Sequence, residues 1–144
     1  MAYGRLAIYR QRSGGSVTGV TDTTARLLQK AGRAVDGAET LVPTDPEAAV
    51  SRAYYSMFYS VEALLNERGL RFRKHGGVHT AFGEHFVKAG LSDPKFHQWL
   101  LQGFNKRITA DYGVDAVVGA DEAQEMIGWA REFLGEARRL LGVT

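Results

Sequence analysis

The sequence predicts an all-α protein, an antiparallel bundle of about five helices. From about residue 23 onward, apolar residues recur at the three- and four-residue spacing of amphipathic helices. Asp-Pro pairs at 45–46 and 93–94 have the form of helix starts, in which a carboxylate caps the helix and a proline occupies its first turn. No segment alternates apolar and polar residues for long enough to form a sheet, and short connectors favour antiparallel neighbours.

Two helices are predicted in the first half of the chain. The first begins at about Thr23 and ends before Pro43, and the second runs from Asp45 to Gly69. Because the second has the wider apolar face, we expect it to be the most buried helix of the bundle. The predicted inward residues are Leu27, Leu28, Ala31, Ala34, Val35 and Ala38 in the first helix, and Val50, Ala53, Tyr54, Met57, Phe58, Val61, Leu64 and Leu65 in the second.

Three more helices follow in the second half. One runs from about Gly76 to Ala89, one from Asp93-Pro94 to Gly113, and the last is capped by Asp121 after a loop at 114–120. Their predicted inward residues are Val78, Phe82, Phe86 and Ala89, then Phe96, Leu100, Leu101, Phe104 and Ile108, then Ala123, Met126, Ile127, Ala130, Phe133, Leu134, Ala137 and Leu141.

The 144 residues suit a single domain. Residues 1–22 become polar and glycine-rich toward their end and are predicted to be a flexible tail, with the bundle over 23–144. The sequence has no cysteine, no apolar stretch near the ~20 residues that cross a bilayer, and no apolar signal core at its start. We therefore expect a cytoplasmic protein without membrane contact.

The end of the fourth predicted helix holds the first candidate site, formed by Lys106, Arg107, Asp111 and Tyr112. Arg107 and Asp111 are four residues apart and share one helix face. Such a pair is commonly an exposed ion pair that contributes little. Alternatively, Arg107 binds a phosphate with Lys106, and Asp111 and Tyr112 orient it or handle protons.

A tyrosine pair on the second helix is the next candidate. Tyr55 and Tyr59 lie four residues apart on a face that flanks the core stripe. The simpler interpretation is that their rings cover the bundle and place their hydroxyls at its rim. The alternative is a surface for a partner or a second copy of the chain.

His75 and His79 have the spacing of two metal ligands on a helix, but no third ligand is evident, so we predict no metal site and no cofactor. A polar role for His75 at a helix start is the preferred interpretation. The preceding connector, with Arg71, Arg73 and Lys74, is either a solvated loop or an extension of a phosphate-binding surface beside Arg107.

Three stretches, in this order, resemble one family. AVSRAYYSMFYSVEALLNERGL (49–70) is similar to the long second helix of HEPN-domain proteins, in particular of the small bacterial and archaeal group called UPF0332. HGGVHTAFGEHFVKAG (75–90) resembles the next segment of that group, and RITADYG (107–113) resembles its arginine-x-x-x-Asp-Tyr ending on the fourth helix. The resemblance covers about residues 23–141.

The resemblance implies an all-α homodimer that brings the fourth-helix motifs of both subunits to a shared cleft. Catalytic members are metal-independent endoribonucleases, often toxins of toxin–antitoxin pairs with a small nucleotidyltransferase. They have an arginine followed, after four to six residues, by a histidine. The histidine moves the proton of the RNA 2′-hydroxyl while the arginine stabilises the charge of the phosphorane.

This sequence departs from that pattern, because Tyr112, Gly113 and Val114 occupy the positions of the histidine and all four histidines precede Arg107. A tyrosine with a pKa near ~10 is a poor base at neutral pH, although Asp111 partly substitutes. Three hypotheses remain open: an endoribonuclease toxin that uses Arg107, Asp111 and Tyr112; a non-catalytic module that binds RNA, a nucleotide or a nucleotidyltransferase; and a bundle that serves only assembly.

Overall fold

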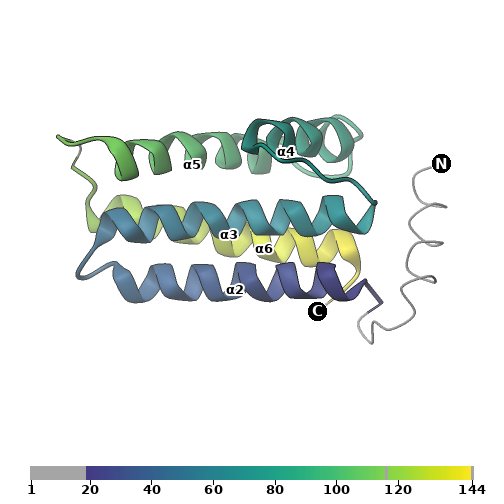
Figure 1. Ribbon diagram of the computed structural model, residues 1–144, viewed down its shortest axis with the longest axis horizontal. Coiled ribbons are helices and arrows are strands. Elements are labelled where there is room, and N and C mark those ends of the chain that lie inside the picture. The colour runs from purple at the N-terminus through teal and green to yellow at the C-terminus, as the bar shows by residue number, and fades with distance from the viewer. Residues whose placement is uncertain (1–18, 116, 144) are drawn as a thin grey trace.

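The computed structural model describes residues 19–115 and 117–143 and confirms the predicted all-α fold. Five α-helices and one π-helical segment make up this part of the chain (Figure 1). They are α2 (Asp22–Leu41), α3 (Pro46–Glu67), α4 (His75–Phe82), η1 (Gly83–Val87), α5 (Pro94–Tyr112) and α6 (Ala120–Leu141).

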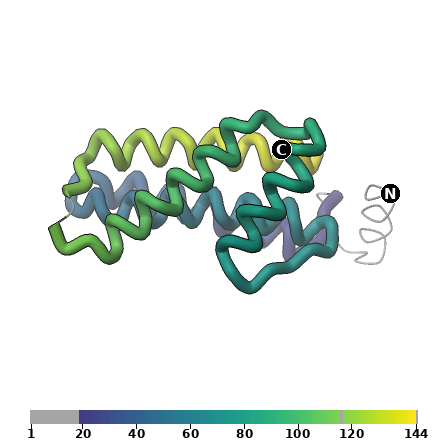
Figure 2. The backbone as a smooth tube through the Cα atoms, turned by 90° about the horizontal axis from the view of Figure 1, so that it is seen from above, coloured from purple at the N-terminus to yellow at the C-terminus, as the bar shows by residue number. Residues whose placement is uncertain are grey.

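The central helix is α3, which contacts α2, α4, α5 and α6. Helices α2, α3 and α6 run side by side, and α4 and α5 lie together against α3 (Figure 1). Seen from above, α5 crosses α3 and α6 diagonally (Figure 2). Of the 22 residues of α3, 14 are buried, which agrees with the expectation that its wide apolar face makes it the inner helix.

The two Asp-Pro signals mark helix starts as predicted. The Asp45 carboxylate accepts the Ala48 N–H at 3.1 Å, and the Asp93 carboxylate accepts the Lys95 N–H at 2.9 Å. Each proline occupies the first turn, where its missing N–H costs no helical hydrogen bond. After α3 the chain turns at Gly69, whose φ of +75° lies in the left-handed region that glycine adopts without strain.

Two predicted boundaries are corrected. The helix expected over 76–89 is α4 followed by the π-turn η1, in which the Lys88 N–H donates to the Gly83 carbonyl. Gly83 packs directly on the His97 ring, where a Cβ would lie 3.0 Å from Nε2. Asp121 is not the cap of α6, because Gly119 occupies that position; Asp121 lies in the first turn, where its charge favours the helix dipole.

Residues 19–22 are the only part of the expected tail that the structure describes. Val20 and Thr21 are buried, and the Thr21 hydroxyl caps α2 by accepting the Thr24 N–H at 3.1 Å. The Thr21 N–H donates to the Glu67 carboxylate at the end of α3. This end of the expected tail is therefore packed against the bundle, and the rest of it lies outside the described residues.

Helix α5 has an apolar face that the monomer leaves partly uncovered. Leu101 and Ile108 were expected to point inward, but 39% and 38% of their surfaces are exposed, and Tyr112 is 73% exposed. These residues are seven and four positions apart and lie along one face. In the part of the chain that the structure describes, no helix has the length and hydropathy of a membrane span.

Candidate anion-binding site

Arg107 lies near the end of α5, on the side that faces α3. One turn earlier, Gly103 allows α5 to approach α3 closely, since a Cβ there would lie 2.6 Å from Cε of Met57. The Arg107 side chain is only 12% exposed. The close packing of the two helices therefore places a guanidinium at the edge of the core, where charge interactions are stronger than in water.

Arg107 has fewer hydrogen bonds than its donors allow. Its Nη1 donates to the Tyr55 hydroxyl and to the Asp111 carboxylate, each at 3.3 Å. The Ser51 hydroxyl donates to the same Asp111 oxygen at 3.4 Å. The Nε of Arg107 is buried and makes no hydrogen bond to any residue that the structure describes. Because a guanidinium carries five N–H groups, donors remain for an anion.

Three aromatic rings surround the guanidinium. The Arg107 Cζ lies 5.4 Å from the ring centres of Tyr55 and Phe104 and 5.6 Å from that of Tyr54. These distances are within the range of cation–π attraction. The rings also restrict the guanidinium to one orientation, so little side-chain entropy is lost when it binds a ligand.

The structure brings His75 and His79 to the same rings. The buried Tyr54 hydroxyl lies 2.8 Å from Nδ1 of His75 and 2.7 Å from Nε2 of His79. The His75 ring stacks on Phe58 with 4.3 Å between ring centres. Both histidines thus turn one nitrogen to a tyrosine, and in the described residues no cluster of three His, Asp or Glu side chains is arranged to hold a metal ion.

Burial and charge keep these side chains in their neutral forms at pH 7. Burial and the positive charge of Arg107 lower the pKa of His75. Burial, with the charges of His75 and His97, lowers the pKa of His79 to about 4. Burial raises the pKa of Tyr54 well above its usual range, although Arg107 opposes the shift. The site therefore has one fixed positive charge beside a neutral histidine pair.

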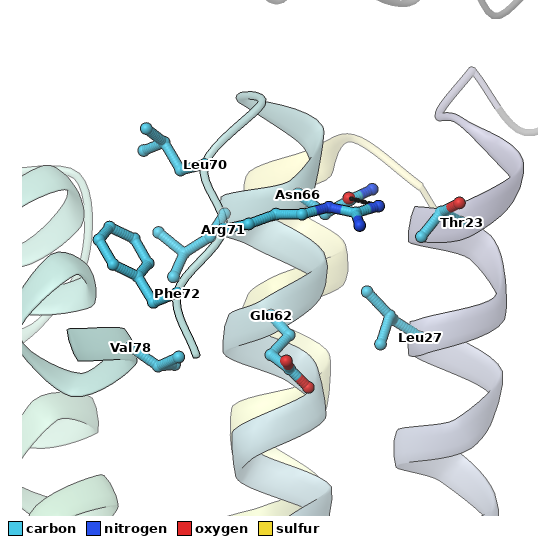
Figure 3. Close-up of a pocket in the computed structure, with 9 residues that line it drawn as sticks. Thr23, Leu27, Glu62, Asn66, Leu70, Arg71, Phe72 and Val78 are labelled. Carbon is cyan, nitrogen blue, oxygen red and sulfur yellow. Dashed lines mark hydrogen bonds between the residues drawn. The ribbon is translucent and has the colours of Figure 1, made fainter. Parts of the chain in front are cut away.

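The side chains of the basic connector before α4 lie in two different surroundings. Arg71 donates to the Asn66 side-chain oxygen at 3.4 Å and lines a cavity of about 320 Å³ that also includes Glu62 (Figure 3). Burial raises the pKa of Glu62, against the charges of Lys30 and Arg71. Arg73 and Lys74 are exposed immediately before α4. All three predicted connector residues are therefore exposed, but Arg71 turns to Asn66 and the cavity, whereas Arg73 and Lys74 immediately precede His75.

The other predicted site residues have different surroundings. Lys106 pairs with Glu122 of α6 at 3.3 Å. Tyr112 projects from the last turn of α5 and is mostly exposed. Tyr59 packs under Lys30, whose Nζ lies 4.6 Å from the ring centre, and Tyr55 contacts Arg107. The two tyrosines thus take part in the packing of the monomer, with one side still accessible.

Comparison with known proteins identifies the family. The family model of the HEPN domain matches residues 24–140. The chain belongs to the HEPN domain family. It is 32% identical to the protein named "Putative toxin MJ0142" of Methanocaldococcus jannaschii over 81% of this chain and 80% of that one. It is 34% identical to a UPF0332 protein of Thermotoga maritima, over 78% and 86% of the two chains.

Sequence reasoning missed the grouping of His75, Tyr54 and His79 with Arg107. The signal was present: His75 and His79 continue the inward stripe of Phe82 and Phe86 at spacings of four, three and four residues. A histidine on an inward stripe requires a hydrogen-bond partner, because an unpaired buried polar group is costly. The spacing of the pair suggested metal ligands or a polar role for His75 at a helix start, and Tyr54 was assigned to the core.

Proposed function

We propose that this HEPN protein binds RNA phosphates at Arg107 and acts as the toxin of a toxin–antitoxin pair. The observation that carries the proposal is the partly buried guanidinium, which lies among three rings and donates two hydrogen bonds to the residues that the structure describes. A preoriented guanidinium of this kind suits a phosphate, which accepts two parallel N–H bonds. The partly exposed rings of Tyr55 and Phe104 beside it suit the faces of unpaired bases.

Asp111 has a defined part in this proposal. Its carboxylate occupies one Nη1 donor of Arg107 in the free protein and is itself 31% exposed. An incoming phosphate competes for that donor, so Asp111 lowers the affinity while it holds the arginine in place. Asp111 is therefore a positioning residue in this proposal, and Tyr112 contributes to the surface around the site.

The toxin assignment rests on the relatives. Two curated relatives in Methanocaldococcus jannaschii are named toxins, and the second is 36% identical over 65% of this chain. The partner that the family resemblance suggests is a small nucleotidyltransferase. Expression of this chain alone should slow bacterial growth, and the Arg107→Ala variant should not. Equal growth inhibition by both forms would contradict a toxin that works through Arg107.

We further propose that the site is completed in a homodimer. The exposed face with Leu101, Ile108 and Tyr112 begins about one and two-thirds helix turns before Arg107 and ends about one and a half turns after it. A row of exposed apolar side chains is typical of an interaction surface. Light scattering should find a dimer for the native chain and for the Gln124→Asp control on α6, but a monomer for Ile108→Asp. A monomeric native chain would contradict the dimer.

The RNA-binding proposal is tested by fluorescence anisotropy with a randomised pool of labelled single-stranded RNA. Arg107→Ala should weaken binding by about tenfold or more. It should also reduce the number of counterions released on binding, measured from the salt dependence of the affinity, by about one. Asp111→Asn should strengthen binding, because it removes the negative charge that competes with the phosphate for Arg107. The matched control is Arg131→Ala, since Arg131 also pairs with carboxylates, those of Asp36 and Glu39. Equal losses for Arg107→Ala and Arg131→Ala would refute a specific site.

A further inference from the structure

The fold brings a histidine beside the aromatic rings that surround Arg107, although the sequence motif after Arg107 lacks one. Positions 112–114, which follow Arg107 on α5 and in the connector, hold no histidine. His75, which is 32 positions earlier in the chain, begins α4 and packs against the same part of α3 as Arg107 does. A group that moves a proton needs only the right position in space, so a histidine from another helix serves equally well.

Arg107 and His75 share the same three aromatic neighbours. The His75 ring centre lies 5.5 Å from that of Phe104 and 5.8 Å from those of Tyr54 and Tyr55. The Arg107 guanidinium lies 5.4–5.6 Å from these rings. Both side chains therefore flank one aromatic cluster, and the charge of Arg107 reaches His75 strongly enough to influence its ionisation. One phosphodiester and its ribose can contact both.

The hydrogen bond to Tyr54 determines which nitrogen of His75 is available. Tyr54 has one O–H, so it donates to one histidine and accepts from the other. When His75 donates from Nδ1, the tyrosine donates to Nε2 of His79, and Nε2 of His75 keeps a free lone pair. Nε2 of His75 makes no hydrogen bond within the part of the chain that the structure describes, and it is not among the fully buried atoms without a partner.

From this geometry we infer that His75 is the proton-transfer residue of an RNA-cleaving site, with Tyr54 and His79 as its positioning residues. The inference rests on the RNA binding proposed above. Nε2 of His75 accepts the proton of a ribose 2′-hydroxyl while the 2′-oxygen bonds to phosphorus. The bond between phosphorus and the 5′-oxygen then breaks, and the proton passes through solvent to that oxygen. The products are a 2′,3′-cyclic phosphate and a 5′-hydroxyl.

The charged groups around His75 favour this role. Arg107 faces it from α5, Tyr54 and Tyr55 from α3, and His79 from α4 itself. Tyr54 and His79 are neutral at pH 7, and the Asp111 carboxylate pairs with Arg107. His75 is therefore a free base at neutral pH, and a bound phosphate would stabilise the imidazolium that forms when it takes a proton.

Cleavage is measured with the full chain, the randomised RNA pool and EDTA, for the native protein and four variants. His75→Gln should slow cleavage by about 100-fold or more, while the RNA affinity changes by less than about threefold. Tyr54→Phe and His79→Gln should slow it less and shift the midpoint of the pH–rate profile, because they change the ionisation of His75. His85→Gln is the matched control, since His85 lies on η1 outside the cluster, and it should cleave at the native rate.

Three further measurements test the chemistry, and the first of them guards against a variant that merely misfolds. Imidazole added to His75→Ala should restore part of the cleavage, which a structural role would not allow. RNA with 2′-deoxyribose throughout should bind and remain uncut by the native protein, because it lacks the attacking oxygen. Products should carry the 2′,3′-cyclic phosphate.

The outcomes separate this inference from the proposed function. Native cleavage that survives in His75→Gln overturns the inference and leaves RNA binding at Arg107 intact. RNA binding by the native chain without any cleavage has the same consequence. If His75→Gln loses affinity in step with Arg107→Ala, His75 is a binding residue and the proton-transfer role is wrong. If the native chain binds no RNA, the proposed function fails together with the inference.

Discussion

Helix α3 carries two polar clusters of opposite character. Near its end, Asn66 and Glu67 bond to Thr21 and Thr24 at the start of α2, and all four residues are at most 5% exposed. Near its middle, Tyr54 links His75 and His79 beside Arg107, and this second cluster reaches the surface.

The two clusters differ in which hydrogen-bond donors and acceptors remain unpaired. In the first cluster the Thr24 hydroxyl is held on two sides, by Asn66 Nδ2 and the Thr21 hydroxyl, each at 3.0 Å. This fixes the start of α2 on α3. In the second cluster the donors of Arg107 and one nitrogen of His75 remain available. On one helix, buried polar groups are thus paired with each other at one place and leave hydrogen-bonding groups available at another.

The pH dependence of stability should come from the second cluster and is the largest expected effect. His79 has a pKa of about 4 in the folded protein and 6.5 as its ordinary value. Between these values the unfolded chain binds more protons, so stability is full above pH 6.5 and falls as the pH decreases toward 4. The loss attributable to His79 is roughly 3 kcal/mol. Urea unfolding at several pH values measures it.

His79→Gln is the control for that experiment, because it removes the titrating group and should flatten the curve over this range. His75 contributes in the same direction, since its pKa is lowered too. A native curve and a His79→Gln curve of the same slope would show that other groups govern the acid response.

Thr24→Val should have the next largest effect, and it should lower stability without changing the Arg107 site. It keeps the shape of the side chain but removes the hydroxyl that accepts from Asn66, so the free energy of unfolding should fall by about 2 kcal/mol. RNA affinity and cleavage should stay at native levels after correction for the folded fraction. A weaker affinity in the folded variant would mean that the two clusters are coupled through α3.

Lys106→Ala should give the smallest effect. Lys106 neighbours Arg107 in sequence, but its charge is already paired with Glu122. Its loss should change RNA affinity by about threefold or less in the anisotropy assay, because an exposed paired charge contributes little. A loss of RNA affinity as large as that of Arg107→Ala would place the binding surface on the α6 side of α5. It would then weaken the proposed role of the three aromatic rings around Arg107.

The sequence predicted those features that depend on neighbours in the chain. Local patterns of this kind include the caps at Asp45 and Asp93, the apolar stripes of α3 and α6, and the end of α5 at Gly113. The π-turn at Gly83 was missed, because it accompanies contact with His97 from another helix. No local sequence pattern distinguishes a helix that ends in a π-turn from one that stays α-helical to its end.

The candidate site was predictable only in part. Arg107 and Asp111 are four residues apart on one helix, so their pairing follows from spacing alone. Tyr54 is 21 positions from His75 and 53 from Arg107, and only the packing of α4 and α5 on α3 joins them. The exposure of Leu101 and Ile108 was likewise missed, since it depends on which parts of α5 the bundle covers.

The most direct test of the account is an NMR titration of the histidine side chains with single-stranded RNA at neutral pH. We predict that the ring nitrogens of His75 shift on RNA addition and that its pKa rises, because a phosphate held by Arg107 stabilises the imidazolium. His85, outside the cluster, should not respond, and Arg107→Ala should abolish the response of His75. RNA binding that leaves His75 unchanged while other histidines shift would contradict the account.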